Sequence, residues 1–503
     1  MIFVCARLAA VIGTITICSL RLKRQDYVDP IYKHSDDHRN IRLAVSMNLV
    51  TFAKELVHTD SIEDQLIGFR ILEHILRCNK MYQRMARKKI RASPGIIQMA
   101  VHKLGSKRDT DEDARGHAAL VLLELAPDLQ VDSFPGVLTA ISSLLGTKKE
   151  DITSGSFSSP TKVSKEFQLL GLQILEKLAD NPENCAKVND AKDHLIPRVI
   201  HHTSCIGGRM DCEIDMEIVH TSLKTLHKLV TTAGEAADEL RRQVSKDPRF
   251  MENIRKIIIG HTEGEPQLLV QATGILALLA LDCMARNEIK RSRGIIQKLI
   301  SFLAGEIDAV EDHILRKLQG SASEALVLLA TPFKEREKIV LSTVSESSVQ
   351  AILAETKLED MENIVHILYN ESAEHRIIVG KLLHNLRAYR GAEFAELLKK
   401  IDQALPKVLQ IIKLSVERVE SDSSNEHASH LYSSEGKLLE SFIGLTVQIC
   451  TNNDEMFFTD ALTTANITVD MDKKGVGVFE HDEHISSIVN KSLKLIDKLE
   501  GYV

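Results

Sequence analysis

The sequence predicts an all-α protein whose helices stack as a right-handed solenoid, with a hydrophobic helix at the N-terminus. One observation is that a short apolar helix occurs three times, as "GIIQMAVHKLG" at Gly95–Gly105, "GVLTAISSLLG" at Gly136–Gly146 and "GIIQKLISFLAG" at Gly294–Gly305. A second is the composition, in which 44% of the residues are apolar but only 4% are aromatic, and Trp is absent. Cores built from Leu, Ile, Val and Ala suit stacked helices better than β-sandwiches.

Residues 1–24 predict a helix that anchors the chain in a membrane. The run Ile2–Leu22 is mostly apolar and just long enough to span a hydrocarbon core of about 30 Å. It ends among three basic residues, Arg21, Lys23 and Arg24. This positive flank predicts that the rest of the chain lies on the cytoplasmic side. Arg7 is unfavourable inside a bilayer, so the alternative is a soluble, buried first helix.

The rest of the chain is predicted to be a helical array bounded by polar segments. Residues 25–40 are interpreted as a linker, 41–417 as the array of repeats, 418–437 as a flexible linker and 438–503 as a C-terminal helical region. A further loop, rich in Ser and charged residues, is expected within the array at Gly146–Lys162.

A second helix also recurs, and each copy precedes a polar turn and a charged segment. It is written "QLIGFRILEHI" at Gln65–Ile75, "QLLGLQILEKL" at Gln168–Leu178 and "VQATGILALLAL" at Val270–Leu281. One small residue occupies the same place in each copy, namely Gly68, Gly171 or Ala272. We expect this residue to let a neighbouring helix approach closely. Gly95 and Gly136 are 41 residues apart, and Gly294 follows after 158 more, close to four such steps. That period is typical of armadillo and HEAT repeats.

The apolar helix carries its own start and stop signals. We expect Ser93 to cap the first copy and Pro94 to occupy its first turn, where the missing N–H costs nothing. Glycine tolerates a positive φ and is expected to end the copies, at Gly105, Gly146 and Gly305.

Several segments resemble known repeat proteins. "LADNPENCAKVNDAKDHLIPRVI" at Leu178–Ile200 resembles the junction between the second and third helices of armadillo repeats. "NLVTFAKELV", "GFRILEHILR", "ARGHAALVLLELAPDLQVDSFPGVLTAISSLL" and "LLGLQILEKLADNPENC" resemble a largely uncharacterised group of plant proteins, mostly from grasses, one of which is named for being brassinolide-enhanced. The likeness covers about Asn48 to Lys400. It implies an armadillo-type array behind hydrophobic spans. Members of the group usually have several such spans, whereas this chain has one.

No motif indicates catalysis, a cofactor or a metal. The phosphate-binding, hydrolase, zinc-protease and dinucleotide motifs are all missing. "DMDKKGVGVFEH" at Asp470–His481 begins like a calcium loop, but Lys474 and His481 stand where oxygen ligands are required. Four residues of types that zinc accepts occur in "HHTSCIGGRMDC", namely His201, His202, Cys205 and Cys212. Their spacing is not a usual one for zinc. We therefore expect a protein that is not an enzyme.

The charge of the chain argues against a dedicated nucleic-acid binder. The net charge is −7 and the pI is near 6.3, whereas such proteins usually carry a basic face. The basic stretch "RMARKKIR" at Arg84–Arg91 is interpreted as a solvated helix face. Eight scattered cysteines without a CxxC motif are typical of reduced, buried thiols.

Three classes of function are compatible with such an array. The preferred one is a non-enzymatic protein-interaction scaffold, tethered to a membrane, that binds an extended partner segment in its concave groove. One alternative is a regulator or enzyme with a site in the C-terminal region, but no recognisable pairing of a nucleophile with a base supports it. The other is a soluble carrier protein. The absence of Trp argues against a nuclear-import-type carrier, because those proteins hold lysine stems between Trp residues.

The recurring apolar helix also predicts which of its faces is buried. Its four copies are counted from the origins Gly95, Gly136, His194 and Gly294. Offsets one, two, five and six are then apolar, with Ser142 as the exception, and we expect these positions to be core.

The opposite face of the same helix is the candidate binding surface. Offsets three and seven carry mainly short polar side chains that can hydrogen-bond to the backbone of an extended peptide, although ordinary solvated surface is the alternative. At offset four, Arg198 and Lys298 would attract acidic side chains, so the expected partner segment is neutral or acidic. The candidate partner-binding residues are Gln98, His102, Thr139, Ser143, Arg198, His201, Gln297, Lys298 and Ser301.

Overall fold

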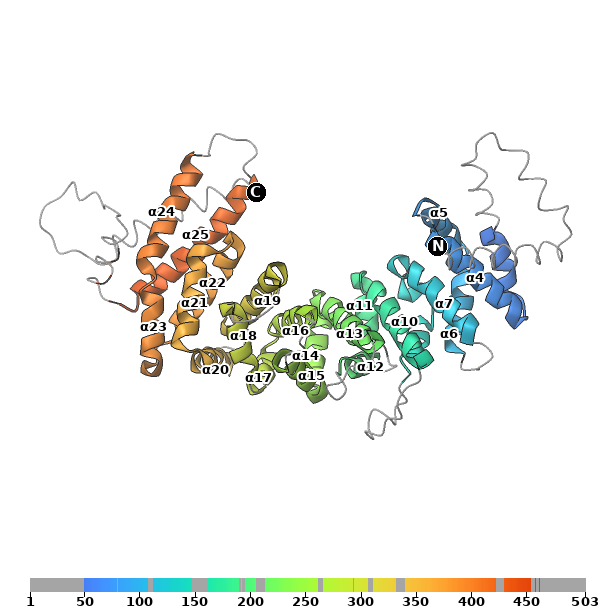
Figure 1. Ribbon diagram of the computed structural model, residues 1–503, viewed down its shortest axis with the longest axis horizontal. Coiled ribbons are helices and arrows are strands. Elements are labelled where there is room, and N and C mark those ends of the chain that lie inside the picture. Colours follow the sequence, from blue (N-terminus) through green and yellow to red (C-terminus); the bar gives the residue numbers. More distant parts are fainter. Residues whose placement is uncertain are drawn as a thin grey trace, which may run out of the picture. The chain divides into compact units, whose positions relative to one another are not determined.

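The computed structural model describes most of the chain between residues 49 and 461. The described residues are 49–78, 80–106, 112–146, 162–189, 191, 195–204, 213–260, 266–292, 294–305, 311–331, 340–421, 429–453, 457 and 461. Every regular element in these ranges is an α-helix or a short 3-10 turn (Figure 1). The predicted all-α class is therefore confirmed for this part of the chain.

Several predicted features lie outside the described residues. They are the hydrophobic helix Ile2–Leu22, the linker 25–40, the loop residues 147–161, the cysteines Cys205 and Cys212, and the segment Asp470–His481. Within the described ranges, no helix combines the length and the apolar character that a bilayer span requires.

The chain divides into two compact units, Met1–Arg198 and Val199–Val503, which are described separately. The boundary falls inside the last helix of the first unit. The elements of the first unit are α4 (Ile62–Cys78), α5 (Lys80–Arg91), α6 (Pro94–Gly105), α7 (Glu112–Leu125), η2 (Ala126–Asp128), η3 (Val131–Ser133), α8 (Val137–Leu144), α10 (Lys162–Leu178), α11 (Pro182–Asn189) and α12 (Leu195–His202).

The second unit continues the same succession of helices. Its elements are α13 (Glu213–Thr231), α14 (Glu235–Lys246), α15 (Pro248–Ile259), α16 (Pro266–Leu279), α17 (Cys283–Arg291), α18 (Ile295–Ala304), α19 (Asp312–Ala330), α20 (Val340–Glu355), α21 (Leu358–Asn370), α22 (Ala373–Arg387), η5 (Ala392–Phe394), α23 (Ala395–Asp402), α24 (Leu405–Ser421) and α25 (Ser429–Cys450).

Like helices of successive repeats pack side by side. In the second unit the long first helices form the row α13, α16, α19, α22 and α25, the second helices the row α14, α17 and α20, and the third helices the row α15, α18 and α21. In the first unit α4, α7 and α10 form the first row, and α6 packs on α8. Each repeat thus buries its apolar stripe against its neighbours, as stacked repeats must. The right-handed sense of the stacking stays a prediction.

The predicted flexible linker 418–437 is largely helical. Helix α24 continues to Ser421 and α25 begins at Ser429, so only residues 422–428 lie outside the described part of this segment. The Ser-rich composition suggested a loop, but the segment also contains Glu, Lys and Leu, which favour helix. Helix α25 packs against α22 and α24. Among the described residues, position 438 therefore lies inside α25, and the C-terminal region 438–503 stays a prediction.

The predicted core positions of the third helices are buried, with Leu138 half-buried as the single departure. Ser142 is only 4% exposed although it is polar. Offsets eight and nine are buried as well in these four helices, at Lys103 and Leu104, Leu144 and Leu145, His202 and Thr203, and Phe302 and Leu303. Six of ten consecutive positions in each of these helices therefore face the interior, so only a narrow face of the helix is exposed to solvent.

The start and stop signals of the third helices are confirmed in part. Helix α6 begins at Pro94 as predicted, but Ser93 makes no side-chain cap because its backbone, with ψ at 73°, is not extended. Gly146 and Gly305 adopt φ values of 73° and 80°. Gly105 does not have a positive φ, so its helix ends without a left-handed residue.

The expected close approach at glycine is present in the long helices. A Cβ atom built on Gly171 would lie 3.0 Å from Leu144 Cβ and 3.1 Å from Leu145 Cδ2. At the equivalent Gly68 it would lie 2.7 Å from Val57 Cγ2. Only a residue without a side chain allows α10 to contact α8 at this distance.

Candidate partner-binding surface

The nine candidate residues lie on α6, α8, α12 and α18 and differ in exposure. We call the face at offsets three, four and seven of these helices the third-helix face. Exposed side chains are found at Gln98, His102, Thr139 and Gln297. Half-buried side chains are found at Ser143, Arg198, His201, Lys298 and Ser301. The exposed members are thus concentrated at offset three.

In the first unit, Ser143 serves to join neighbouring helices. Its hydroxyl donates to the carbonyl oxygen of Leu104 at 3.1 Å and to that of Ala140 at 2.7 Å. The Arg115 guanidinium donates to the carbonyl oxygen of Ser143 at 3.2 Å, and to that of Leu104 at 2.9 Å. These bonds tie α6, α7 and α8 together, so Ser143 contributes to stacking.

The expected role of Arg198 in attracting acidic side chains is not supported by its contacts. Its Nη1 donates to the carbonyl oxygen of Ser142 near the end of α8. Because its guanidinium is bound to a backbone carbonyl of α8, Arg198 mainly connects α12 to α8. Lys298 is also engaged, because its Nζ lies 5.6 Å from the ring centroid of Phe302 on the same helix.

His201 lies half-buried on α12 beside His202, with 5.5 Å between the ring centroids. Burial lowers the pKa of His201, and the positive charge of Arg249 lowers it further. The imidazole is therefore neutral at neutral pH, and one ring nitrogen can donate while the other accepts.

Two further helices occupy the same row in the second unit, and the sequence comparison missed both. Counted from Arg249 and Glu359, α15 and α21 bury the same offsets one, two, five, eight and nine. Their exposed faces differ from the others because they carry ion pairs. Glu252 lies 2.8 Å from Arg255 on α15, and Glu362 on α21 lies 2.6 Å from Lys400.

Each missed helix departs from the apolar pattern at one offset, at Arg255 (offset six) in α15 and at Asp360 (offset one) in α21. Asp360 is buried there, and Asn253 is buried at offset four of α15. Asn253 Nδ2 donates to Thr203 Oγ1 at 3.1 Å, and Asp360 accepts the backbone N–H of Lys357 at 2.9 Å. Because these polar groups are hydrogen-bonded, they can be buried without breaking the packing. In the second unit the row of third helices therefore carries charged pairs at Glu252 and Glu362, the residues at offset three of α15 and α21.

The comparisons with known proteins find similarity of structure only. No family model and no curated protein sequence matches the chain, so nothing there supports the resemblance to the plant group. An engineered protein solved as a structural-genomics target is 14% identical, with 90% of this chain and 99% of that chain covered and a TM-score of 0.47. A designed armadillo repeat protein is 13% identical, with coverages of 62% and 100% and a TM-score of 0.41. A second engineered target is 16% identical, with coverages of 58% and 96% and a TM-score of 0.39. These are distant likenesses of structure, each with a TM-score below 0.5.

Proposed function

We propose that this chain is a non-enzymatic protein-interaction scaffold that binds an extended partner segment along its third-helix face. The proposal applies to the face within each unit. An array of stacked helices with long parallel rows is suited to holding an extended chain. The partner segment is neutral or acidic.

The lack of exposed charge on α6 and α8 is the observation that carries this proposal. Charged residues make up 26% of the whole chain, yet α6 and α8 contain a single one, Lys103, which is 7% exposed. The two helices pack side by side and expose Gln98, His102 and Thr139. Interface cores are depleted in Lys, Glu and Asp, because stripping water from a charge is costly. A solvated helix face would normally carry such charges.

The exposed side chains are those suited to a peptide backbone. Gln98 and Gln297 each offer an amide that both donates and accepts, and His102 adds a ring that can do either. We leave Arg198 out of the contacts with the partner because it holds the Ser142 carbonyl.

We further propose that Ile2–Leu22 tethers the scaffold to a membrane, with the array on the cytoplasmic side. Its apolar length and the basic residues that follow support this. A relation to the plant group described above is part of the same proposal, and the shared helix patterns support it.

Site-specific crosslinking tests the binding face. A photoreactive amino acid is placed in the full chain at Gln98 or, as the matched control, at Gln130, which is exposed in the same unit but belongs to none of the third helices. We expect a crosslinked partner from position 98 and none from position 130. Equal crosslinking from both positions would show that the face has no special role.

A variant then measures the contribution of the face. Gln98→Ala, His102→Ala, Thr139→Ala and Gln297→Ala are combined, and the crosslinked partner is titrated against this variant and against a control with Gln130→Ala, His313→Ala and Gln403→Ala. All of these side chains are exposed, so both variants should fold. We expect the first to bind at least about tenfold more weakly, which corresponds to about 1.4 kcal/mol. Unchanged affinity would exclude the third-helix face.

Fractionation tests the tether. The full chain should stay with the membranes after an alkaline wash, and deletion of residues 2–22 should release it. Glycans on Asn370, Asn466 or Asn490, each in an acceptor sequence, would place the array in a lumen and contradict the cytoplasmic assignment.

A further inference from the structure

Helix α5 borders a basic cleft that the scaffold function does not use. The cleft has a volume of about 670 Å³ and is lined by Gln83, Arg84, Arg87, Lys88, Arg91 and Asp128. We call it the α5 cleft. Its four cationic residues are spaced at i, i+3, i+4 and i+7, so they share one face of α5. Helix α5 lies at the N-terminal end of the described repeats (Figure 1).

Two of these cations are held in place by carboxylates. Arg87 Nη2 lies 3.1 Å from Glu124 Oε2, and Arg91 Nη1 lies 3.5 Å from Asp128 Oδ1. The Glu124 carboxylate also accepts from Gln83 Nε2 at 3.1 Å. Because both carboxylates come from the end of α7 and the turn η2, they fix the two guanidinium groups at the edge of the cleft before any ligand arrives.

The other two cations have no such compensation among the described residues. Neither Arg84 nor Lys88 lies within 4.0 Å of a described carboxylate, and both are exposed. Helix α5 contains six Lys and Arg residues and no Asp or Glu. Like charges at these spacings repel one another and weaken a helix. The positive charge is therefore concentrated at a cost that a bound anion would offset.

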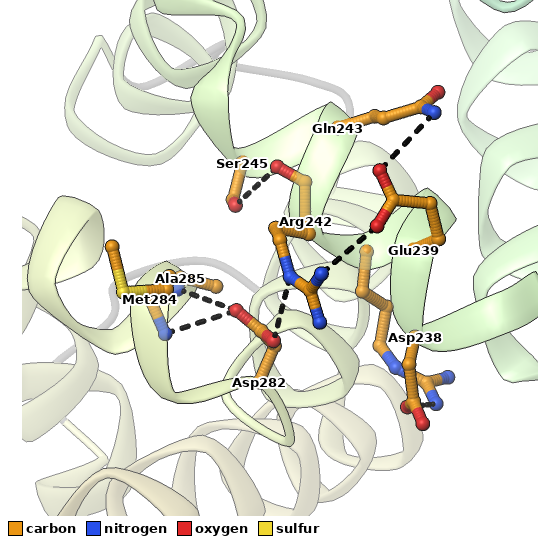
Figure 2. Close-up of polar contacts among 9 residues, drawn as sticks. Asp238, Glu239, Arg242, Gln243, Ser245, Asp282, Met284 and Ala285 are labelled. Carbon is orange, nitrogen blue, oxygen red and sulfur yellow. Dashed lines mark hydrogen bonds and ion pairs between the residues drawn. The ribbon is translucent and has the colours of Figure 1, made fainter. Parts of the chain in front are cut away.

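The equivalent helix α14 shows what a solvated second helix looks like in this chain. Its arginines are matched by carboxylates on the same helix and on the next repeat, as Figure 2 shows for Arg242 between Glu239 and Asp282. The distances from the guanidinium of Arg242 to the two carboxylates are 2.9 and 3.7 Å. Asp282 in turn caps α17 by accepting from the backbone of Met284 and Ala285 (Figure 2). The unmatched cations of α5 depart from this pattern.

We propose that the α5 cleft binds a small ligand that carries several phosphate groups. A phosphate carries about −1.5 to −2 charges near neutral pH, so one of them would balance Arg84 and Lys88. A second would lie beside the guanidinium groups of Arg87 and Arg91. Arginine forks match phosphate oxygens in pairs, and Arg84 and Arg87 are placed one turn apart. Such a ligand is either a free polyphosphorylated metabolite or the headgroup of a phosphorylated lipid.

The limited extent of the cleft favours this ligand over a macromolecule. Its volume of about 670 Å³ has room for a ligand of small-molecule size. Its lining comes from one helix and one adjoining turn, whereas an acidic peptide or a nucleic acid would need a basic track across several repeats.

Calorimetric titration of the full chain in non-ionic detergent tests the proposal, with inositol hexakisphosphate as the probe. The test variant is Arg84→Glu with Lys88→Glu. The matched control is Lys246→Glu with Arg291→Glu, which changes the net charge equally on the exposed faces of α14 and α17. We expect the probe to bind the parent chain with an affinity that falls as salt is added. The test variant should bind at least about tenfold more weakly, and the control within about twofold of the parent.

Several results would overturn the proposal. They are the absence of binding to the parent chain, an equal loss in both variants, and equally tight binding of a poly-glutamate peptide or of a short oligonucleotide. Thermal melting followed by circular dichroism verifies that the variants fold.

A water-soluble, short-chain phosphoinositide then distinguishes the two possible sources of the ligand. If the phosphoinositide binds as tightly as the free inositol phosphate, the ligand is a lipid headgroup. If the phosphoinositide does not bind, the ligand is a free metabolite. Because the third-helix face is untouched in these variants, failure here is distinct from failure of the scaffold proposal.

Discussion

Arg387 and Asp402 form a buried ion pair that joins α22 to α23. Arg387 Nε donates to Asp402 Oδ1 at 2.6 Å, and Nη2 donates to Oδ2 at 3.0 Å. The two side chains are 9% and 10% exposed. This paired geometry satisfies both charges at once, so the energetic risk lies in removing only one of them.

Asp402→Ala should destabilise the second unit by about 3–5 kcal/mol, because it leaves a buried guanidinium without its partner. The double variant Arg387→Met with Asp402→Leu removes both charges and should recover most of that loss. Urea unfolding of the three chains provides the comparison. If the double variant is as unstable as the single one, the pair contributes by shape rather than by charge.

The thiol of Cys450 should make stability depend on alkaline pH. Burial raises the pKa of the Cys450 thiol to about 12 from its usual value of 9.0, and the negative charge of Asp402 adds to this increase. The unfolded thiol therefore loses its proton first. Its contribution to stability is fully present below pH 9.0 and is lost as the pH rises towards 12. Unfolding free energies measured across this range should fall more steeply for the parent chain than for Cys450→Ala. Parallel curves would contradict the assignment.

Two glycines on long helices of the first unit should respond oppositely to the same substitution. Gly171→Ala should be destabilising, and Gly171→Leu should cost about 1–3 kcal/mol, because the new atoms would meet Leu144 and Leu145. At Gly116 an added Cβ would lie 4.0 Å from Phe167, an ordinary contact. Gly116→Ala should therefore stabilise the helix by about 0.5–1 kcal/mol. Melting temperatures that shift in the same direction would refute the packing argument.

Arg198→Ala should lower stability without changing the affinity for a partner segment, because its guanidinium holds the Ser142 carbonyl. Gln297→Ala should show the reverse pattern, since its side chain is exposed. Measuring the melting temperature and the partner affinity of both variants separates the two roles. A loss of affinity in Arg198→Ala at unchanged stability would return Arg198 to the binding face.

The core of the third helices was predictable because its signal is local. Apolar pairs recur at fixed offsets, and the helical period alone then determines which side is buried. The same pattern is interrupted by Arg255 at offset six of α15 and by the buried Asp360 at offset one of α21. Asp360 accepts a hydrogen bond from the backbone of Lys357, and the buried Asn253 of α15 donates one to Thr203. The partner of Asn253 is 50 residues away in the chain, and no periodicity reveals it.

The candidate sites depended more strongly on distant contacts. Arg198 occupies a position where the sequence predicts an exposed cation. Its guanidinium instead donates to the Ser142 carbonyl, 56 residues earlier in the chain. The sequence of Arg84–Arg91 predicts a solvated face, because it shows the charges but not the turn that places Asp128 beside them. The helical period alone therefore identifies which face of each helix is buried. Which charged side chains have a partner is visible only in the packed structure.

The shared burial pattern of the third helices has a consequence for how the array could have grown. Offsets one, five, eight and nine are buried in α6, α8, α12, α15, α18 and α21, so a copy inserted by unequal recombination would meet neighbours that already accept its inner face. Such a chain could be lengthened or shortened by whole repeats without a new core being invented. The exposed offsets would meanwhile be free to diverge, as the ion-paired faces of α15 and α21 have done beside the uncharged face of α6 and α8.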